Sequence, residues 1–563
     1  MDKIWLQHYP AGVPAEVSVE ACPTLLALMD DSFQRYHERP AWRFMGTDVR
    51  FGDVDRHSRT LAAWLQSRGL QPGDRVAIML PNVPQYAVAV AAILRIGCIV
   101  VNVNPLYTPR ELAHQLQDSG AKAIVILENF AATLAQVIAG LPTRTVLLAA
   151  MGDMLGLVKG TLVNSVVRHV KKMVPPYTWP TDAGVQVERF PAALSAGRHL
   201  PWQPFEARPD DVAVLQYTGG TTGVSKGAVL LHRNLVANVL QCEAWYQPAL
   251  HQLGADTQLV TVCALPLYHI FAFNVNMMLS LRVGGLNVMI PNPRDLPALL
   301  KALRAQPVHS FPAVNTLFNA LANHPDIDTV DWSQLKISVG GGMAVTAGAA
   351  QAWLEKTGCP ICEGYGLSET SPVVSCNPVD SRAYTGNIGY PLPSTEMALL
   401  DDDGRTVPPG SPGEIAVRGP QVMAGYWQRP DETARVMTAD GWFRTGDVGV
   451  VDERGAFRII DRKKDMILVS GFNVYPNEVE DVLSQLPGVL ECAAVGVSDE
   501  HSGEAVKLVI VRRDPALTEA QVRQFCEGHL TGYKRPRVIE FRDELPKTPV
   551  GKILRRELRG RVS

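Results

Sequence analysis

Short apolar runs of strand length alternate with helical stretches along the first quarter of the chain. The runs are Val76–Leu80, Ile99–Val103 and Ala123–Leu127, and apolar residues recur at helical spacing from Gln85 and again from Pro109 to Ser119. Strands that alternate with helices in this way are typical of a parallel sheet with helices on both faces. We therefore predict an α/β fold with doubly wound sheets, whose ligands lie outside the carboxyl ends of the strands.

The chain is too long for one hydrophobic core. At 563 residues it is expected to form two or more domains. Apolar residues from Thr24 to Arg68 follow helical spacing, and Val482 to Pro549 has the pattern of a compact α+β unit. Within that unit we expect strands at Cys492–Val497 and Val506–Val511 and a helix from Thr518 to Leu530.

Composition excludes some classes of protein. Apolar residues make up 46% of the chain, charged residues make up 19%, and the net charge is −3, so nothing indicates a nucleic-acid partner. The nine cysteines are an odd number and are scattered, which argues against a disulfide framework and for a reducing compartment. Cys359 and Cys362 have the spacing of a redox or zinc motif but have no partner pair, so structural thiols are favoured.

No membrane-spanning segment is expected. The first ten residues lack the apolar core of a signal peptide. The run from Tyr86 to Val103 is interrupted by Arg95 and is rich in small residues, which favours a buried helix followed by a strand. We therefore predict a cytoplasmic protein.

The segment from Met151 to Trp179 interrupts the alternation. Apolar residues fall on one helical stripe, namely Leu155, Val158, Leu162, Val163, Val166, Val167, Val170 and Met173. Basic residues are interspersed, namely Lys159, Arg168, Lys171 and Lys172, and no acidic residue occurs between Met154 and Met173. Such a helix would lie in a membrane interface or pack on its own protein, and the pattern favours neither.

A glycine- and hydroxyl-rich stretch from Tyr217 to Ala228 follows a predicted strand at Val212–Leu215. It contains Gly219, Gly220 and Gly223, the hydroxyl residues Thr218, Thr221, Thr222 and Ser225, and Lys226. Glycines let successive backbone N–H groups converge on an anion, while hydroxyls and a lysine add donors, metal ligands and charge. The spacing is not that of a Walker A motif, and a plain surface turn is disfavoured. We predict a phosphate-binding loop of a different nucleotide enzyme.

Further site candidates follow in order. His269 lies among aromatic residues before an apolar helix, a setting that suits a lipid groove better than a packed core histidine. A strand at Ile337–Gly340 continues into Gly341 and Gly342, where backbone is able to approach a flat ring. The stretch Glu363–Thr370 offers a tyrosine for stacking, a hydroxyl, and a carboxylate for a hard cation.

Taken together, these stretches resemble the acyl-adenylate-forming enzymes, and among them the bacterial long-chain fatty acid:CoA ligases. The resemblance covers essentially the whole chain. Its motifs are Tyr217–Ala228, Glu363–Thr370, Asp440–Asp447, Asp461–Asp465 and Pro549–Ile553, supported by Val101–Arg110 and Ser470–Pro476. The resemblance implies ATP-dependent activation of a fatty acid to acyl-CoA through acyl-AMP.

The resemblance also implies roles for individual residues. Catalytic roles are expected for Lys226, Glu369, Lys464 and Lys552, and Thr218 and Glu369 would hold Mg²⁺. Nucleotide or CoA contacts are expected for Tyr217, Thr218, Gly219, Gly220, Thr221, Thr222, Gly223, Ser225, His269, Gly341, Gly342, Glu363, Gly364, Tyr365, Gly366, Ser368, Asp447, Arg462 and Gly471. Ser368 replaces the usual threonine, Leu231 a usual hydroxyl residue, and Asp440 the usual asparagine, which leaves acyl preference undetermined.

The implied organisation is a large N-terminal domain (residues 1–460), a hinge (461–464) and a small mobile C-terminal domain (465–563). ATP, Mg²⁺ and CoA are the expected cofactor and co-substrates, with a fatty acid as the substrate. Peripheral contact with the inner membrane and a homodimer are left open. Two alternatives remain: an acyl-AMP ligase that passes its acyl group to a carrier protein, and a membrane-docked fatty-acid import or binding partner.

Overall fold

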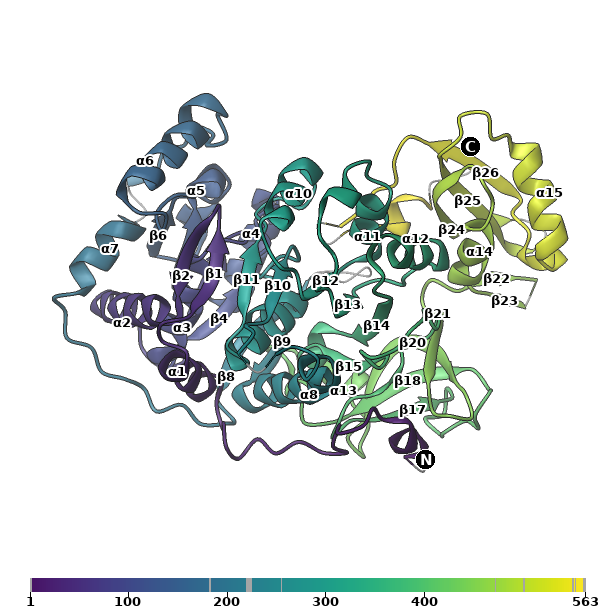
Figure 1. Cartoon of the computed structure of the whole chain (residues 1–563), viewed down its shortest axis with the longest axis horizontal. Coiled ribbons are helices and arrows are strands. Elements are labelled where there is room, and N and C mark those ends of the chain that lie inside the picture. The colour runs from purple at the N-terminus through teal and green to yellow at the C-terminus, as the bar shows by residue number, and fades with distance from the viewer. Residues whose placement is uncertain are drawn as a thin grey trace.

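The computed structural model describes residues 3–181, 184–218, 225–254, 256–470, 472–499, 502–548, 551 and 553–559. Most of the chain forms a large α/β domain, and the residues after β21 form a small α+β domain at one end (Figure 1). The fold class predicted from the sequence is confirmed.

An eight-stranded sheet forms one half of the large domain. In spatial order its strands are β19 (Gly425–Tyr426), β9 (Lys226–Leu231), β8 (Val212–Thr218), β4 (Ile99–Asn102), β3 (Arg75–Met79), β5 (Ala123–Leu127), β6 (Thr145–Ala149) and β7 (Gln186–Arg189). Strands β8, β4, β3, β5, β6 and β7 are parallel, whereas β9 runs antiparallel to β8. Its helices are α2 (Phe51–Ser67), α3 (Gln85–Arg95), α4 (Pro109–Ser119), α5 (Ala131–Ala135) and α7 (Phe190–Gly197).

Alternating side chains on β3 show that this sheet is covered on both faces. Val76 and Ile78 belong to the cluster that contains α2 and α3, whereas Ala77 and Met79 belong to the cluster that contains Leu112 of α4. Successive residues of a strand point to opposite faces, so a strand that is buried throughout requires helices on both sides. The near-continuous apolar runs in the sequence follow from this arrangement.

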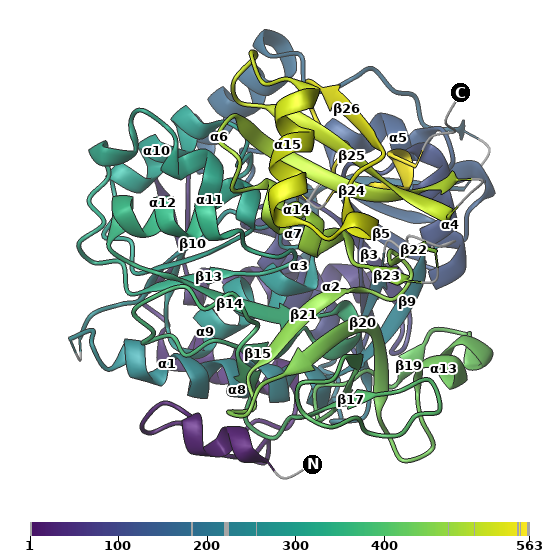
Figure 2. The ribbon, with the colours of Figure 1, turned by 90° about the vertical axis from the view of Figure 1, so that its right-hand side faces the viewer.

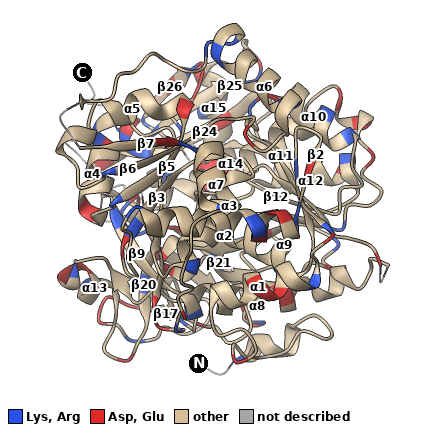
Figure 3. Ribbon diagram, turned by 90° about the vertical axis from the view of Figure 1, so that its left-hand side faces the viewer, with Lys and Arg blue, Asp and Glu red and all other residues tan. Residues whose placement is uncertain are grey.

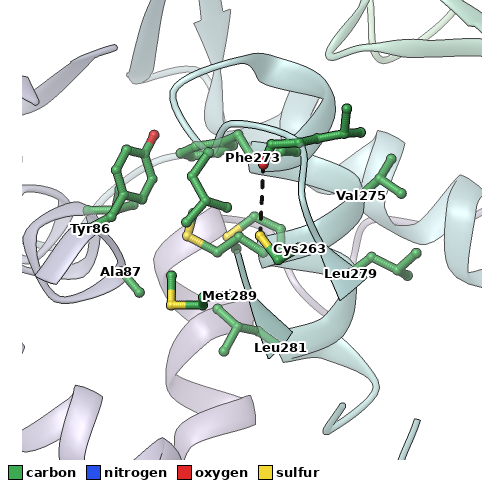
Figure 4. Packing of buried hydrophobic residues seen from close by; sticks show 14 of the residues in the cluster. Tyr86, Ala87, Cys263, Phe273, Val275, Leu279, Leu281 and Met289 are labelled. Atoms are coloured by element: carbon green, nitrogen blue, oxygen red, sulfur yellow. Dashed lines mark hydrogen bonds between the residues drawn. The ribbon is translucent and has the colours of Figure 1, made fainter. Parts of the chain in front are cut away.

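A nine-stranded sheet forms the other half. Its order is β16 (Tyr390–Pro391), β15 (Val373–Cys376), β14 (Ile361–Gly366), β13 (Ile337–Gly340), β12 (Ser310–Ala313), β10 (Val260–Cys263), β11 (Leu286–Met289), β1 (Pro40–Phe44) and β2 (Thr47–Arg50). Its helices are α1 (Leu25–Arg35), α8 (His232–Leu250), the π-helix η6 (Ala272–Met278), α9 (Leu279–Arg282), α10 (Leu296–Arg304), α11 (Asn315–Ala322) and α12 (Ala347–Thr357). Figure 4 shows η6 and α9 side chains packed with Cys263 and Met289 in the core.

The helical interpretation of residues 24–68 was partly wrong. Helices α1 and α2 lie within this stretch, but the hairpin of β1 and β2 separates them. Trp42 and Phe44 of β1 are buried, and β1 pairs with β11, whose sequence lies more than two hundred residues away. A strand held by such a distant partner leaves little trace in local spacing.

A four-stranded antiparallel sheet, which the sequence did not indicate, completes the large domain. It consists of β17 (Glu396–Leu400), β18 (Gly413–Arg418), β20 (Phe443–Val451) and β21 (Phe457–Arg462), with α13 (Pro430–Val436) nearby. Strand β21 leads into the small domain, and the predicted hinge at 461–464 begins at its end.

The small domain contains β22 (Ile467–Val469), β23 (Phe472–Val474), β24 (Val489–Asp499), β25 (Gly503–Arg512) and β26 (Val538–Arg542), with α14 (Pro476–Leu483) and α15 (Glu519–His529). It has a hydrophobic cluster of its own, built around residues such as Val479, Leu508 and Val522. The predicted strands and the helix that follows Thr518 are present. In Figure 2 this domain lies above β20 and β21.

The basic amphipathic segment forms α6 (Leu157–Ser165) and a π-helical turn, Val166–Val170, at the end of the molecule opposite the small domain (Figure 1). The residues of the predicted stripe do not share one environment, because Leu155 and Val167 are buried whereas Val158 and Leu162 are exposed. Across the described ranges, none of the helices combines the length and apolarity needed to cross a bilayer.

Candidate active site

A cavity of about 1510 Å³ lies at the carboxyl ends of the parallel strands, as predicted. Strand β8 and the segments after β10, β13 and β14 contribute to its wall, and so do Lys547, Thr548 and Ile553 of the small domain. Of the predicted site residues, those on its wall are Tyr217, Thr218, Ser225, Lys226, His269, Gly341, Gly342, Gly364, Tyr365, Gly366, Ser368, Glu369, Asp447, Arg462 and Lys464. Glu363 is not part of this lining. Gly219, Gly220, Thr221, Thr222, Gly223, Gly471 and Lys552 lie outside the described residues.

The base of the glycine-rich loop is fixed by the β8–β9 pair. Thr218 pairs with Lys226 in the register of these strands, and the Ser225 hydroxyl donates a 2.8 Å hydrogen bond to the Thr218 carbonyl oxygen. The hydroxyl of Tyr217 donates to Oδ2 of Asp118 at 2.7 Å. Both ends of the loop are therefore held by the sheet, beside the cavity.

Lys226 lies among residues that the sequence did not single out. Its ammonium is paired with Glu432 of α13 and lies 5.3 Å from the ring centroid of Tyr426. The Tyr426 hydroxyl donates a 2.8 Å hydrogen bond to Oε1 of Glu369. Tyr426 therefore links the loop lysine to the predicted metal-binding carboxylate. Tyr426 lies outside all of the motifs quoted above, so the sequence contained no signal for this role.

Glu369 is a deeply buried carboxyl group, with 8% of the residue exposed. Burial raises its pKa above the ordinary value, and the hydrogen bond from Tyr426 opposes that rise. A carboxylate and a hydroxyl are oxygen ligands of the kind that Mg²⁺ prefers, and Mg²⁺ commonly takes only one or two protein ligands beside phosphate oxygens and waters. Among the described residues no cluster of three or more His, Cys, Asp or Glu would hold a metal by itself. Glu369 and Thr218 therefore fit a magnesium ion that nucleotide phosphates help to bind.

A carboxylate, a phenol and a guanidinium form a second polar group on the cavity wall. Oδ2 of Asp447 accepts a 2.6 Å hydrogen bond from the Tyr365 hydroxyl, and Oδ1 lies 3.2 Å from Nε of Arg462. Asp447 and Arg462 are partners in the β20–β21 register, so the sheet holds the two side chains together. This group presents a negatively charged acceptor to a ligand's hydroxyl groups.

Glycines allow close approach at the predicted adenine-site positions. A Cβ at Gly341 would lie 2.9 Å from Cε1 of Phe271, and Gly342 has φ +79°. Glu363, behind this wall, accepts a 3.2 Å hydrogen bond from the Val345 N–H, and burial raises its pKa to about 8. Burial therefore favours the protonated, neutral form of Glu363.

One part of the cavity wall is apolar. Trp245 and Tyr246 of α8, Phe271, Val275 of η6 and Leu392 line it, and His269 stands at the junction before the helical segment, as expected. Val275 appears in Figure 4 on the helical segment that packs over the core. Aromatic and aliphatic walls of this kind suit a hydrocarbon chain.

Comparison with known proteins agrees with this geometry. The model of the AMP-binding enzyme family matches residues 29–427, and that of the AMP-binding enzyme C-terminal domain matches residues 478–552. The chain belongs to the AMP-binding enzyme family. A long-chain-fatty-acid–CoA ligase of Escherichia coli O6:H1 is 53% identical to it over 560 residues, which cover 99% of this chain and 98% of the relative.

Solved structures of adenylate-forming enzymes share the fold. The anthranilate CoA ligase AuaEII in complex with anthranoyl-AMP superposes with a TM-score of 0.81 at 25% identity, over 97% of each chain. ATP-bound MatB from Rhodopseudomonas palustris gives a TM-score of 0.78 at 28% identity, over 95% of this chain and 98% of that one. The predictions of an acyl-adenylate-forming enzyme, of a long-chain fatty acid:CoA ligase and of ATP and CoA as its co-substrates are confirmed. The individual residue roles and the domain limits stay predictions.

Proposed function

We propose that this chain converts a long-chain fatty acid, ATP and CoA into acyl-CoA, AMP and pyrophosphate in two half-reactions that share the cavity. The observation that carries the proposal is the composition of the wall. The base of the nucleotide loop, an apolar surface and residues of the small domain, among them Lys547, all line one space.

In the first half-reaction an oxygen of the fatty carboxylate attacks the α-phosphorus of ATP, and pyrophosphate leaves. The reaction brings anions together, so the site must offset negative charge where it develops. Lys226 and Lys552 are assigned that task, and Asp447 is assigned the ribose hydroxyls. Mg²⁺, held by Thr218 and Glu369, would supply Lewis-acid neutralisation of the phosphates.

In the second half-reaction the CoA thiolate attacks the acyl carbonyl carbon, and AMP leaves with the bonding electron pair. The thiol needs the approach that Lys552 uses during the first step, and one rigid arrangement does not serve both. We therefore propose that residues 465–563 rotate about the hinge at 461–464, which contains Lys464, between the two half-reactions. Gly471 would belong to the loop that the rotation presents to CoA.

Pyrophosphate release from ATP and palmitate, with and without CoA, tests the overall reaction. We expect release with palmitoyl-CoA formation when CoA is present. Release that yields only palmitoyl-AMP would favour the carrier-protein alternative, and no release would favour a binding partner without turnover.

A Lys552→Ala variant tests the two-step assignment. We expect it to lose acyl-AMP formation, by about 10²–10³-fold for one removed charge, yet to convert supplied palmitoyl-AMP and CoA to palmitoyl-CoA. Equal loss of both half-reactions would refute domain alternation.

A second proposal concerns membrane contact. Exposed apolar residues gather on and around α6, with Leu157 91% and Val158 86% exposed, beside Leu162, Val170 and Met173. Arg168 pairs with Glu128 and Lys159 donates to the Met45 carbonyl, so these two basic groups serve the fold. Lys and Arg mix with Asp and Glu over this end of the molecule (Figure 3), so apolar insertion must contribute more than charge.

Sedimentation with anionic liposomes checks this contact. Leu157→Asp combined with Val158→Asp should abolish binding, and Lys171→Glu with Lys172→Glu should weaken it. Leu490→Asp, at an exposed position in the small domain, is the control and should change nothing. Undiminished binding of the α6 variants would refute the proposal. The homodimer also remains an expectation, which sedimentation velocity tests.

A further inference from the structure

Arg555 is a largely buried guanidinium three residues after Lys552, in the short helix η10 (Arg555–Glu557). Its Nη2 donates to Oδ1 of Asn477 at 2.5 Å and to Oε2 of Glu480 at 2.7 Å, both on α14. Carboxylate oxygens of Asp461 and Asp465 each lie 3.8 Å from Nη1. Arg555 therefore connects the segment that carries Lys552 with α14 and with the predicted hinge.

Asp461 is where this cluster reaches the large domain. It lies at the end of β21, and none of it is exposed. Its Oδ2 accepts a 2.8 Å hydrogen bond from the Asn477 N–H, and its Oδ1 accepts a 2.7 Å bond from the Arg462 N–H. A carboxylate that accepts from the first turn of a helix stabilises that helix end. Asp461, at the end of β21 and the start of the predicted hinge, thus caps α14.

The same segment touches the large domain at a second place. A Cβ at Gly551 would lie 2.7 Å from Oγ1 of Thr316 on α11, so a side chain at 551 would collide there. Ile553 and Leu554, which follow Lys552, line the cavity. Gly551 therefore packs against α11 of the large domain, and Ile553 and Leu554 lie on the cavity wall.

We propose that Asp461, Asn477 and Arg555 form a latch that positions the Lys552 segment for acyl-AMP formation and opens before the thioester is made. The inference rests on the proposed function, since it uses the roles given above to Lys552 and to the hinge. Rotation at Lys464 of the hinge would separate Asp461, which lies on β21, from Asn477, whereas Asn477, Glu480 and Arg555 all belong to the small domain and stay together. The latch touches no substrate, so its members are positioning residues.

Half-reaction assays separate this role from a general role in folding. Arg555→Met removes the charge and keeps most of the stem. We expect pyrophosphate release from ATP and palmitate without CoA to fall about 10²-fold, the loss typical of a reacting group displaced by about 1 Å. Palmitoyl-CoA formation from supplied palmitoyl-AMP and CoA should stay close to the parent rate.

Two further variants complete the test. Asp461→Asn keeps the shape but removes the charge, and it should show the same split; it decides the matter if Arg555→Met does not fold, as judged by circular dichroism. Arg559→Met is the matched control, because Arg559 pairs with Asp465 in the same segment at 3.0 Å and is more exposed. It should leave both half-reactions unchanged.

The outcomes distinguish this inference from the proposed function. Suppose that Lys552→Ala separates the two half-reactions as expected. The latch is then wrong if Arg555→Met and Asp461→Asn slow both half-reactions equally or slow neither. If Lys552→Ala slows both half-reactions equally, the proposed domain alternation is wrong, and the latch, which depends on it, is wrong as well.

Discussion

Replacing Asp447 with asparagine tests the assignment of the ribose site. Asp447 lies on β20 and is 5% exposed. Its two oxygens are engaged by Tyr365 at 2.6 Å and by Arg462 at 3.2 Å, so the carboxylate is held in place before a nucleotide arrives. The asparagine side chain would keep the size of the original and one acceptor oxygen, but it would lose the charge.

The expected loss follows from the strength of the hydrogen bonds. A hydrogen bond to a charged acceptor contributes about 1.5–3 kcal/mol, against about 1 kcal/mol for a neutral pair. With two ribose hydroxyls affected, we expect a loss of about 2–3 kcal/mol, which corresponds to a fall of about 30–150-fold in kcat/KM for ATP.

The assay compares kcat/KM for ATP and for 2′-deoxy-ATP in the parent and in Asp447→Asn, as in a double-mutant cycle. The parent should discriminate against this analogue by about 10–150-fold, the value of one charged hydrogen bond, and the Asp447→Asn variant should discriminate much less. Asp402→Asn is the control, because Asp402 is an exposed aspartate that pairs with Lys463 at 2.6 Å. Discrimination that is equal in the parent and in Asp447→Asn would refute a contact between this carboxylate and the 2′-hydroxyl.

Three further predictions follow from the buried groups of the site. Folding raises the pKa of Glu363 from 4.5 to about 8. Between these pH values the folded protein keeps a proton that the unfolded chain has lost. The free energy of unfolding of the parent should therefore fall by about 1.4 kcal/mol for each unit by which the pH rises from 4.5 to about 8. Urea unfolding from pH 5 to 8 should show this fall reduced in Glu363→Gln; equal slopes in the two proteins would contradict it. Glu369→Gln should slow pyrophosphate release by about 10²–10³-fold, and Tyr426→Phe, which keeps the carboxylate, should slow it less; the reverse order would exclude Glu369 as the metal ligand. Val275→Trp should fill part of the space beside the apolar wall and shift the preference towards shorter fatty acids, with a loss of about 0.8 kcal/mol for each CH₂ that is no longer buried. The measurement is kcat/KM for acids of eight to eighteen carbons. The same chain-length preference in the variant and the parent would place the acyl chain elsewhere.

The sequence predicted a helix or strand correctly wherever the spacing of apolar residues in the segment matched the faces that the fold buries. Strands β3, β4 and β5 and helix α4 occur where the apolar runs and the spacing predicted them. The strands are buried against helices on both faces, and α4 buries the one face that carries Leu112 and Leu116. The hairpin of β1 and β2 and the sheet from β17 to β21 were missed. Strand β1 pairs with β11, far along the chain, so its local periodicity carries little of the information. The strands of the sheet from β17 to β21 pair with strands near them in the chain, and no strand was predicted for them.

The sequence motifs identified residues that line the site, but only the structure shows which side chains from different parts of the chain contact each other. Thr218, Glu369 and Asp447 line one cavity as the resemblance implied. Tyr426 and Glu432 were not foreseen, although they contact Glu369 and Lys226. A side chain that acts by touching another motif residue has no spacing relation to it in the sequence, and only the packing of β19 and α13 brings it there.

The hairpin below the nucleotide loop has a practical consequence. Because Thr218 and Lys226 face each other across β8 and β9, the seven residues between them enter and leave at one fixed pair of points. The intervening peptide should therefore behave as an exchangeable cassette. Loops of equal length from other members of the family should graft onto these two anchors without changes to the sheet, so phosphate binding becomes open to engineering independently of acyl preference.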